Sequence, residues 1–541
     1  MALLLFAVIS SPDYASGLAS FGGRSDQQPE GQTAPSNNYT GQVIDSIEID
    51  ARNIYELQDD RYDGFFFRTA NRLHIVTRQQ IVRQELLLRK GEPFSPELAS
   101  ETARNLRTRL PFKDAWVEVE ELAPGHVLMR VVTIDQWSLI GGLRSIDRNG
   151  DETDLRIGFE ERNFLGRAQF VSCDYYYKEK RPDYVMTSFR EPRLLSWPLA
   201  ASLDYRSDLY NTLKHAGIGR PYYSLAQSMS MQLDVRDAKV QQRRYDAVGH
   251  LVAQWLSSSD QVDLAVGLRG GPTYRKAALT GGYKYYSARV SDLQLAALGG
   301  TNGDVLVDST LHEFSLAADY QILNFIVERR IRGFGYTEDY TMGLRIGGVY
   351  GRALTPDFND HYYDRVGGEL SWADRFRSNL LLAGYTYSYW FRHNEGIRRA
   401  SVLEGVWYNN ELPFVTLAAR SRYEFDHGGP FPRLVLGSKN GIRGFATEQS
   451  AGDRMHIVNI EGRFFTGLEL LSVKIGSALF CDLGRTWHPE EKLTLGGYYV
   501  SAGVGLRFSL ENLLRGEIIR ADAVCTKYGN WEISVGTGQY F

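Results

Sequence analysis

The sequence predicts an all-β transmembrane barrel of about 16 antiparallel strands, preceded by one small α/β domain. Aromatic residues make up 12% of the 541 residues, with 32 Tyr and 53 Gly, and the net charge of −4 is modest. No apolar run approaches the ~20 residues that a membrane helix needs. Many segments instead alternate between apolar and polar residues, as expected for strands that meet lipid on one side only.

The N-terminus predicts a secretion signal over residues 1–19. Residues 2–9 form an apolar run, and Gly17-Leu18-Ala19 offers a cleavage site between small residues. No Lys or Arg precedes the run, so a buried strand of a soluble domain is the alternative. Residues 20–42 are rich in Gly, Ser, Pro, Asn and Gln, which predicts a disordered leader.

Residues 43–135 predict one α/β domain in the order strand, helix, helix, strand, strand. Residues 44–49 alternate as a strand, and residues 77–88 fit an amphipathic helix with Thr77 and Gln80 as a capping box. A second helix is expected to begin at Ser95-Pro96, because Ser caps helices and Pro suits their first position. Two strands, 115–121 and 126–134, complete the predicted domain.

The alternating pattern continues from residue 136 to residue 541. At roughly 25 residues per strand and loop, these about 405 residues would give about 16 strands, an even number as in bacterial barrels. The last predicted strand places six residues on one face, which we expect to be the lipid-facing row: Trp531, Ile533, Val535, Thr537, Gln539 and Phe541.

One loop and two following strands carry the candidate functional motif. The loop contains Ile442, Arg443, Gly444 and Phe445, and the strands carry Glu461 and Asp482 on their polar faces. Side chains alternate along a strand, so both carboxylates can point into a polar lumen. We expect a loop that folds back into this lumen to pair Arg443 with Glu461 and Asp482.

The order of these features resembles the BamA/TamA superfamily of outer-membrane barrels, also called bacterial surface antigen proteins. Residues 161–166 resemble its Glu-x-Asn-Phe-x-Gly segment, and residues 43–135 resemble a single POTRA domain, with residues 59–70 as an insertion. The resemblance implies a bacterial outer-membrane location with the POTRA domain in the periplasm. It also implies outer-membrane lipid, client polypeptides and periplasmic accessory proteins bound through the POTRA domain as partners.

No motif for catalysis or cofactor binding is found in the sequence. A nucleophile elbow, a zinc motif, a P-loop and a dinucleotide fingerprint are all missing. Cys173, Cys481 and Cys525 lie far apart without metal-ligand spacing. Lys and Arg do not cluster as nucleic-acid binding would require. We therefore expect no cofactor, no metal, no nucleic acid and no enzymatic activity.

The resemblance implies a barrel that inserts polypeptides into the outer membrane or translocates them across it. We expect a lateral seam between the first strand, which carries Gly141 and Gly142, and the last strand, which ends at Phe541. A client strand could add to an edge exposed there. The alternative is a two-partner-type secretion pore dedicated to one client protein. A barrel enzyme or a passive porin is a third reading, which the missing Ser/His pair and the predicted POTRA domain disfavour.

Overall fold

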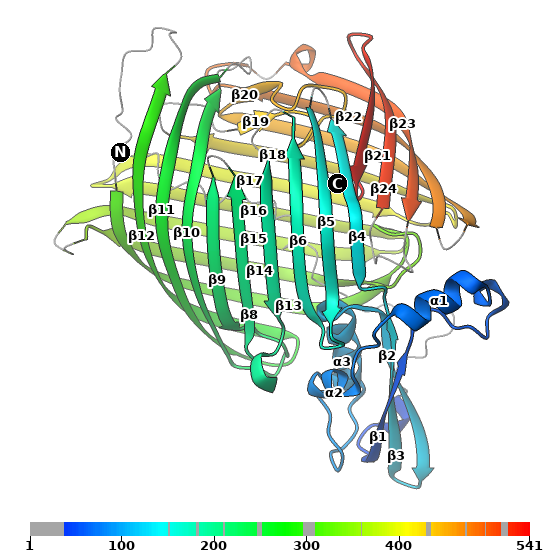
Figure 1. Ribbon diagram of the computed structural model, residues 1–541. Coiled ribbons are helices and arrows are strands. Elements are labelled where there is room, and N and C mark those ends of the chain that lie inside the picture. The colour runs from blue at the N-terminus through cyan, green and yellow to red at the C-terminus, as the bar shows by residue number, and fades with distance from the viewer. Residues whose placement is uncertain are drawn as a thin grey trace.

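The computed structural model describes residues 37–149, 152–179, 183–208, 211–245, 251–295, 309–356, 358, 360–428, 434–470, 473–492, 494–509 and 518–541. The predicted signal (1–19) and most of the predicted leader (20–42) lie outside these residues. In the described part the chain forms a small α/β unit beside a closed β-barrel (Figure 1).

The α/β unit contains a three-stranded sheet with helices packed on it. Its strands are β1 (Val43–Arg52), β2 (Phe112–Ala123) and β3 (His126–Asp135), in the order β1–β3–β2. β1 pairs with β3 in parallel, and β2 pairs with β3 in antiparallel. Its helices are α1 (Phe65–Leu73), α2 (Gln79–Gln84) and α3 (Pro96–Arg109). Ile44, Leu106 and Phe112 are fully buried at the centre of its core.

The predicted start of the second helix is confirmed, and the predicted capping box of the first is wrong. The Ser95 hydroxyl accepts a hydrogen bond from Leu98 N at 3.3 Å, with Pro96 at the first helical position. α2 is shorter than expected and has Arg78 as its N-cap. Thr77 instead donates from its hydroxyl and from its backbone N–H to Asp135 Oδ2, at 3.0 and 2.7 Å, so a tertiary partner takes the place of the local cap.

Residues 59–70, predicted from the sequence to be an insertion, contribute most of α1. Phe67 and Ala70 are buried on its inner face, against Ile54 and Tyr55. Trp137, which lies just before the barrel begins, packs on the same cluster. Among the described residues, no helix is both long enough and apolar enough to cross a membrane.

The barrel contains 20 strands within the described residues, so the expectation of about 16 is wrong. Consecutive strands pair in antiparallel, and β25 closes the sheet on β4. Many connections are shorter than assumed: β15 and β16 are separated by residues 377–378 alone.

Its strands are β4 (Leu139–Asn149), β5 (Glu152–Phe164), β6 (Gln169–Lys178), β7 (Tyr184–Glu191), β8 (Ala200–Asp208), β9 (Thr212–Arg220), β10 (Met229–Tyr245), β11 (Leu251–Gly270), β12 (Arg275–Leu295), β13 (Ser309–Glu328), β14 (Glu338–Leu354), β15 (His361–Phe376), β16 (Asn379–Arg392), β17 (Glu395–Asn409), β18 (Val415–His427), β21 (Arg454–Leu470), β22 (Val473–Trp487), β23 (Tyr499–Ser509), β24 (Ile518–Thr526) and β25 (Trp531–Thr537). Single 3₁₀ turns lie at Asn37–Tyr39, Asp60–Tyr62, Leu194–Ser196 and Leu495–Gly497.

The two faces of the barrel wall differ in polarity. Large apolar side chains are exposed on the outer face, for example Leu264 on β11, Leu279 on β12 and Leu403 on β17. The inner face carries ion pairs such as Arg365 with Glu313 and Arg420 with Glu404. This alternation is the one expected for a wall with lipid outside and polar groups inside.

Helix α3 and the segment after α1 hold the α/β unit against one rim of the barrel. Arg107 on α3 donates from Nε to Asp339 Oδ2 at 2.8 Å, and Asp339 is the second residue of β14. Glu101 on the same helix accepts a hydrogen bond from Leu225 N at 2.6 Å, in the β9–β10 connection. Arg78 N donates to Gly166 O at 2.9 Å, in the β5–β6 turn. The unit is therefore tied to several separate points of the rim.

Candidate functional site

The segment between β18 and β21 folds back against the inner wall of the barrel. It contains a two-stranded hairpin of β19 (Leu434–Leu436) and β20 (Ser450–Gly452), with residues 437–449 at its tip. Ile442 and Phe445 are buried in an apolar cluster with Leu436 of the hairpin and Ile457 of β21. We call residues 434–452 the lumen loop.

Two glycines allow the lumen loop to pack closely on the wall. Gly444 has φ +81°, and a Cβ at this position would lie 2.8 Å from Val524 Cγ1 on β24. Gly484 on β22 lies beneath Ile442, and a Cβ there would come within 2.7 Å of Ile442 Cγ2. Glycine at 444 supplies both the left-handed backbone and the missing side chain.

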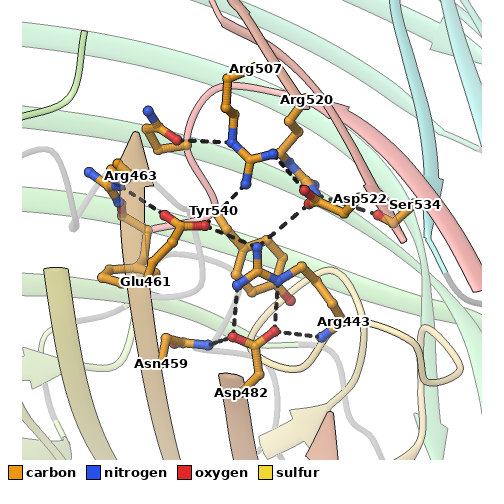
Figure 2. Close-up of polar contacts among 12 residues, drawn as sticks. Arg443, Asn459, Glu461, Arg463, Asp482, Arg507, Arg520, Asp522, Ser534 and Tyr540 are labelled. Carbon is orange, nitrogen blue, oxygen red and sulfur yellow. Dashed lines mark hydrogen bonds and ion pairs between the residues drawn. The ribbon is translucent and has the colours of Figure 1, made fainter. Parts of the chain in front are cut away.

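Arg443 is the centre of the site (Figure 2). Its Nε and Nη2 donate to Asp482 Oδ2 and Oδ1 at 2.7 and 2.9 Å, and its Nη1 donates to Glu461 Oε1 at 3.1 Å. Its backbone N–H also donates to Asp482 Oδ2 at 3.2 Å. The structure thus brings together the arginine and both carboxylates that the sequence singled out. The side chains of all three residues are fully buried.

Three further arginines and one aspartate extend this network around the wall. Arg463 Nε donates to Glu461 Oε2 at 2.8 Å, and Arg507 Nη2 donates to Glu461 Oε1 at 3.1 Å. Arg520 Nη1 donates to Asp522 Oδ2 at 2.9 Å, and Asp522 lies 3.5 Å from Arg443 Nη1. Arg507 also pairs with Asp522. We call the four arginines and three acids the lumen network.

The guanidinium of Arg443 lies between two aromatic rings. Its carbon is 3.5 Å from the ring centre of Phe480 on β22 and 4.1 Å from that of Tyr540. Burial alone would lower the pKa of Arg443, but Asp482, Glu461 and Asp522 outweigh burial and raise that pKa above its ordinary value. Arg443 is therefore a fixed positive charge held by carboxylates and by ring faces.

Tyr540 belongs to a C-terminal segment that turns into the lumen. β25 ends at Thr537, and Gly538 follows with φ +76°. Tyr540 Oη donates to Ser438 O of the lumen loop at 2.8 Å, and burial raises the pKa of this hydroxyl. Arg463 Nη2 donates to Phe541 O at 2.9 Å, with the guanidinium carbon 5.3 Å from the Phe541 ring centre.

The expectation that Phe541 and Gln539 continue the lipid-facing row is therefore wrong. Ile533 does lie on that row, with 65% of its surface exposed. Gln539 instead donates from Nε2 to Arg332 O at 3.2 Å, and Phe541 packs against an apolar cluster that contains Tyr408. After Gly538 the Tyr540 ring lies against the Arg443 guanidinium, and Phe541 O accepts a hydrogen bond from Arg463, both inside the barrel.

The junction of β4 and β25 differs from its neighbours. Among the described residues its ladder contains one residue pair, Val535 with Arg148, whereas β24 pairs with β25 from Thr537 to Trp531. Gly141 and Gly142 lie at the other end of β4, paired with Phe159 and Gly158 of β5. We call this junction the seam.

Continuing the antiparallel register of Val535 and Arg148 would place Phe541 opposite Gly142. The turn at Gly538 removes these last residues from the ladder. The edge of β4 that holds Gly141 and Gly142 is thus not paired with β25 within the described residues.

Sequence reasoning missed several members of the site. Arg463 and Arg507 lie on the polar faces of predicted strands, so alternation placed them in the lumen without indicating that both bind Glu461. Asp522 and Arg520 alternate in the same way along β24. Asn459, whose Nδ2 donates to Asp482 Oδ1 at 2.8 Å, alternates with Glu461 and Arg463 on the same polar face. Phe480 and Tyr540 carried no signal, because their role depends on the position of the loop. The described residues contain no cluster of three His, Cys, Asp or Glu side chains suited to a metal ion.

Comparison with known proteins finds no matching family model and no matching curated protein. Among solved structures, the chain is similar to BamA from Haemophilus ducreyi lacking POTRA domains 1–3, at 12% identity and a TM-score of 0.40, over 92% of this chain and 84% of that chain. It is also similar to CdiB from Acinetobacter baumannii, at 11% identity and a TM-score of 0.43, over 97% and 95%. CdiB from Escherichia coli matches at 11% identity and a TM-score of 0.45, over 92% and 76%.

Proposed function

We propose that this protein is a non-enzymatic outer-membrane barrel of the BamA/TamA superfamily that inserts polypeptides into the membrane or translocates them across it. The observation that carries this proposal is the seam, where one residue pair, Val535 with Arg148, joins β25 to β4 among the described residues. Each backbone hydrogen bond in a ladder resists separation, so the seam is the weakest junction for strand separation.

The edge of β4 near Gly141 and Gly142 is the proposed docking place for a client. An unpaired strand edge presents N–H and C=O groups that another strand can bind. In a bilayer these groups have no water to satisfy them, so a client strand that pairs with β4 gains more there than in solution. Gly141 and Gly142 bring no side chains that would obstruct its approach.

The lumen loop is the proposed brace of the wall beside the seam. Arg443 connects the loop to β21 and β22 through Glu461 and Asp482, and Asp522 carries the network onto β24. β24 in turn pairs along the length of β25. The brace would hold the β25 side of the seam fixed. Lys439 Nζ of the same loop also reaches Asp154 Oδ2 on β5 at 2.7 Å, and this ion pair would have to break for the β4 side to move. The α/β unit, as a POTRA domain in the periplasm, would receive clients and accessory proteins at that rim.

A cross-link across the seam tests the proposal. In a chain with Cys173, Cys481 and Cys525 replaced by Ala, Arg148→Cys and Val535→Cys would be joined by oxidation. The protein would then be assayed in proteoliposomes for folding of an added unfolded eight-stranded barrel. We expect loss of activity after oxidation, recovery after reduction, and unchanged heat resistance of the protein on gels.

The matched control is Ala523→Cys with Ile533→Cys, a register pair of β24 and β25. This cross-link should leave activity unchanged, because it does not touch the seam. Full activity of the locked seam would reject lateral entry.

Transport through the lumen is the second candidate, as in a two-partner-type secretion pore for one client. The observation that favours it is the size of the barrel, since 20 strands enclose a wider lumen than the 16–18 strands of water-filled porins. A secretion pore would have to release the lumen loop during transport. Cross-linking the loop to the wall, with the seam left free, would then stop secretion and spare insertion.

A further inference from the structure

The outer face of α1 is an exposed apolar surface with no role in the site described above. Phe65 is 87% exposed, Leu73 is 69% exposed and Phe66 is 47% exposed. At about 100° per residue these three side chains lie within one arc of the helix surface, beside the arc that holds Phe67 and Ala70, which are buried in the α/β unit. The apolar surface of the helix therefore extends beyond the part that its own domain covers.

The two ends of the α1 segment are tied to the barrel rim on opposite sides of the seam. Before the helix, Tyr62 Oη donates to Glu469 Oε1 at 3.5 Å, in the hairpin that joins β21 and β22. After the helix, Ile75 O accepts a hydrogen bond from Asn163 Nδ2 at 2.9 Å, at the end of β5. In the barrel order, β23, β24, β25 and β4 lie between these two anchors. α1 therefore lies at the rim next to the seam, level with the lower ends of β4 and β5 in Figure 1.

Exposed apolar side chains also lie at both anchors of the α1 segment. At one anchor Leu468 and Leu470 are 62% and 67% exposed. At the other anchor Ile75 and Leu165 are 53% and 50% exposed. Exposed apolar residues therefore flank the helix at both points where its segment is tied to the barrel.

The charges of α1 fit the same surroundings. Arg68 and Arg72 are exposed beside the apolar face, and Arg68 pairs with Asp63 at the surface. A helix with aromatic and leucine side chains on one face and arginines at its border is suited to the boundary between lipid headgroups and acyl chains.

We infer that α1 is a membrane-interface helix: Phe65, Phe66 and Leu73 enter the headgroup region of the bilayer next to the seam. This inference rests on the membrane location in the proposed function. The occupant of the exposed face is lipid, because both anchors of the α1 segment lie on the barrel rim and carry exposed apolar side chains themselves. Its consequence is that the α/β unit is held to the bilayer at the place where a client strand would meet β4.

Spin labels on single cysteines in proteoliposomes test the inference, in the chain with Cys173, Cys481 and Cys525 replaced by Ala. A label at Phe65→Cys is compared with one at Leu122→Cys, which is 52% exposed and lies at the β2–β3 hairpin of the same unit. A third label at Leu479→Cys, on the outer face of β22 and 52% exposed, reports the barrel wall. Collision with oxygen reports lipid, and collision with a water-soluble nickel chelate reports water.

We expect a several-fold higher ratio of oxygen to nickel collision at Phe65→Cys than at Leu122→Cys, close to the ratio at Leu479→Cys. If the ratio at Phe65→Cys equals that at Leu122→Cys while Leu479→Cys reports lipid, α1 faces water or a protein. The inference about α1 is then overturned, and the proposed function is not affected. If Leu479→Cys itself reports water, the barrel is not in the bilayer, and both the proposed function and the inference fail.

Discussion

Replacing Arg443 with methionine should lower the free energy of unfolding of the barrel more than replacing a half-exposed arginine does. Asp482 binds the Arg443 side chain through both carboxylate oxygens, and its other hydrogen-bond donors are Asn459 Nδ2 at 2.8 Å and the backbone N–H of residue 443 at 3.2 Å. Glu461 would keep Arg463 and Arg507, and Asp522 would keep Arg520. The cost of Arg443→Met therefore falls on Asp482, a fully buried carboxylate left with these two neutral donors and no positive charge bound to it.

Breaking a buried ion pair on one side costs about 3–5 kcal/mol, because the remaining charge stays buried without its partner. This corresponds to about 10²- to 10⁴-fold in the unfolding equilibrium. Arg345→Ala is the matched control, since Arg345 pairs with Glu369 while their side chains remain 37% and 38% exposed. The control should cost at most about 1 kcal/mol.

The measurement is urea unfolding in detergent micelles or liposomes, followed by tryptophan fluorescence and by heat resistance on gels. Two double variants separate the causes. Arg443→Met with Asp482→Asn should recover part of the loss, because the stranded charge is removed. Arg443→Met with Glu461→Gln should recover none, because Arg463 would then lose its carboxylate partner and Arg507 would keep only Asp522. An unfolding midpoint for Arg443→Met equal to that of Arg345→Ala would refute the reasoning.

Three further outcomes are expected. Leu279→Arg, on the outer face of β12, should cost about 2–4 kcal/mol near mid-membrane, and its inward-facing neighbour Thr280→Arg should cost far less; equal urea midpoints in liposomes would contradict this. Gly444→Ala should loosen the lumen loop, because φ +81° disfavours a side chain, and an unchanged rate of proteolysis within the loop would count against the brace. Burial raises the pKa of Glu101 on α3, so its stabilising contribution is present at low pH and lost as pH rises through that raised value. Glu101→Gln keeps an acceptor for Leu225 N and should make the attachment of the α/β unit to the barrel rim less pH-dependent. Protease cleavage at the junction measures this attachment, and a wild-type pH profile of cleavage in the variant would show that Glu101 is not the source of the pH dependence.

The sequence by itself determined the alternation of the barrel strands and two partners of Arg443, Glu461 and Asp482. Period two along a strand is a local property, so Glu461 and Asp482 could be assigned to the inner face without knowing the shape of the barrel. The cap at Ser95 was predictable for the same reason, because a helix start is set by a few neighbouring residues. Thr77 shows the limit of this approach, since a tertiary partner, Asp135, displaced the local cap.

Only the tertiary structure decided the number of strands, the course of residues 538–541 and the position of α1. Strand number depends on how many short turns divide the chain, and alternation does not reveal where a turn falls. The aromatic residues of 538–541 fit a lipid-facing strand by pattern, yet Tyr540 and Phe541 meet Arg443 and Arg463 inside the lumen. These partners come from β21 and from the lumen loop, far away in the sequence. Their attraction is a property of the closed barrel, which brings charges from separate strands into one buried network.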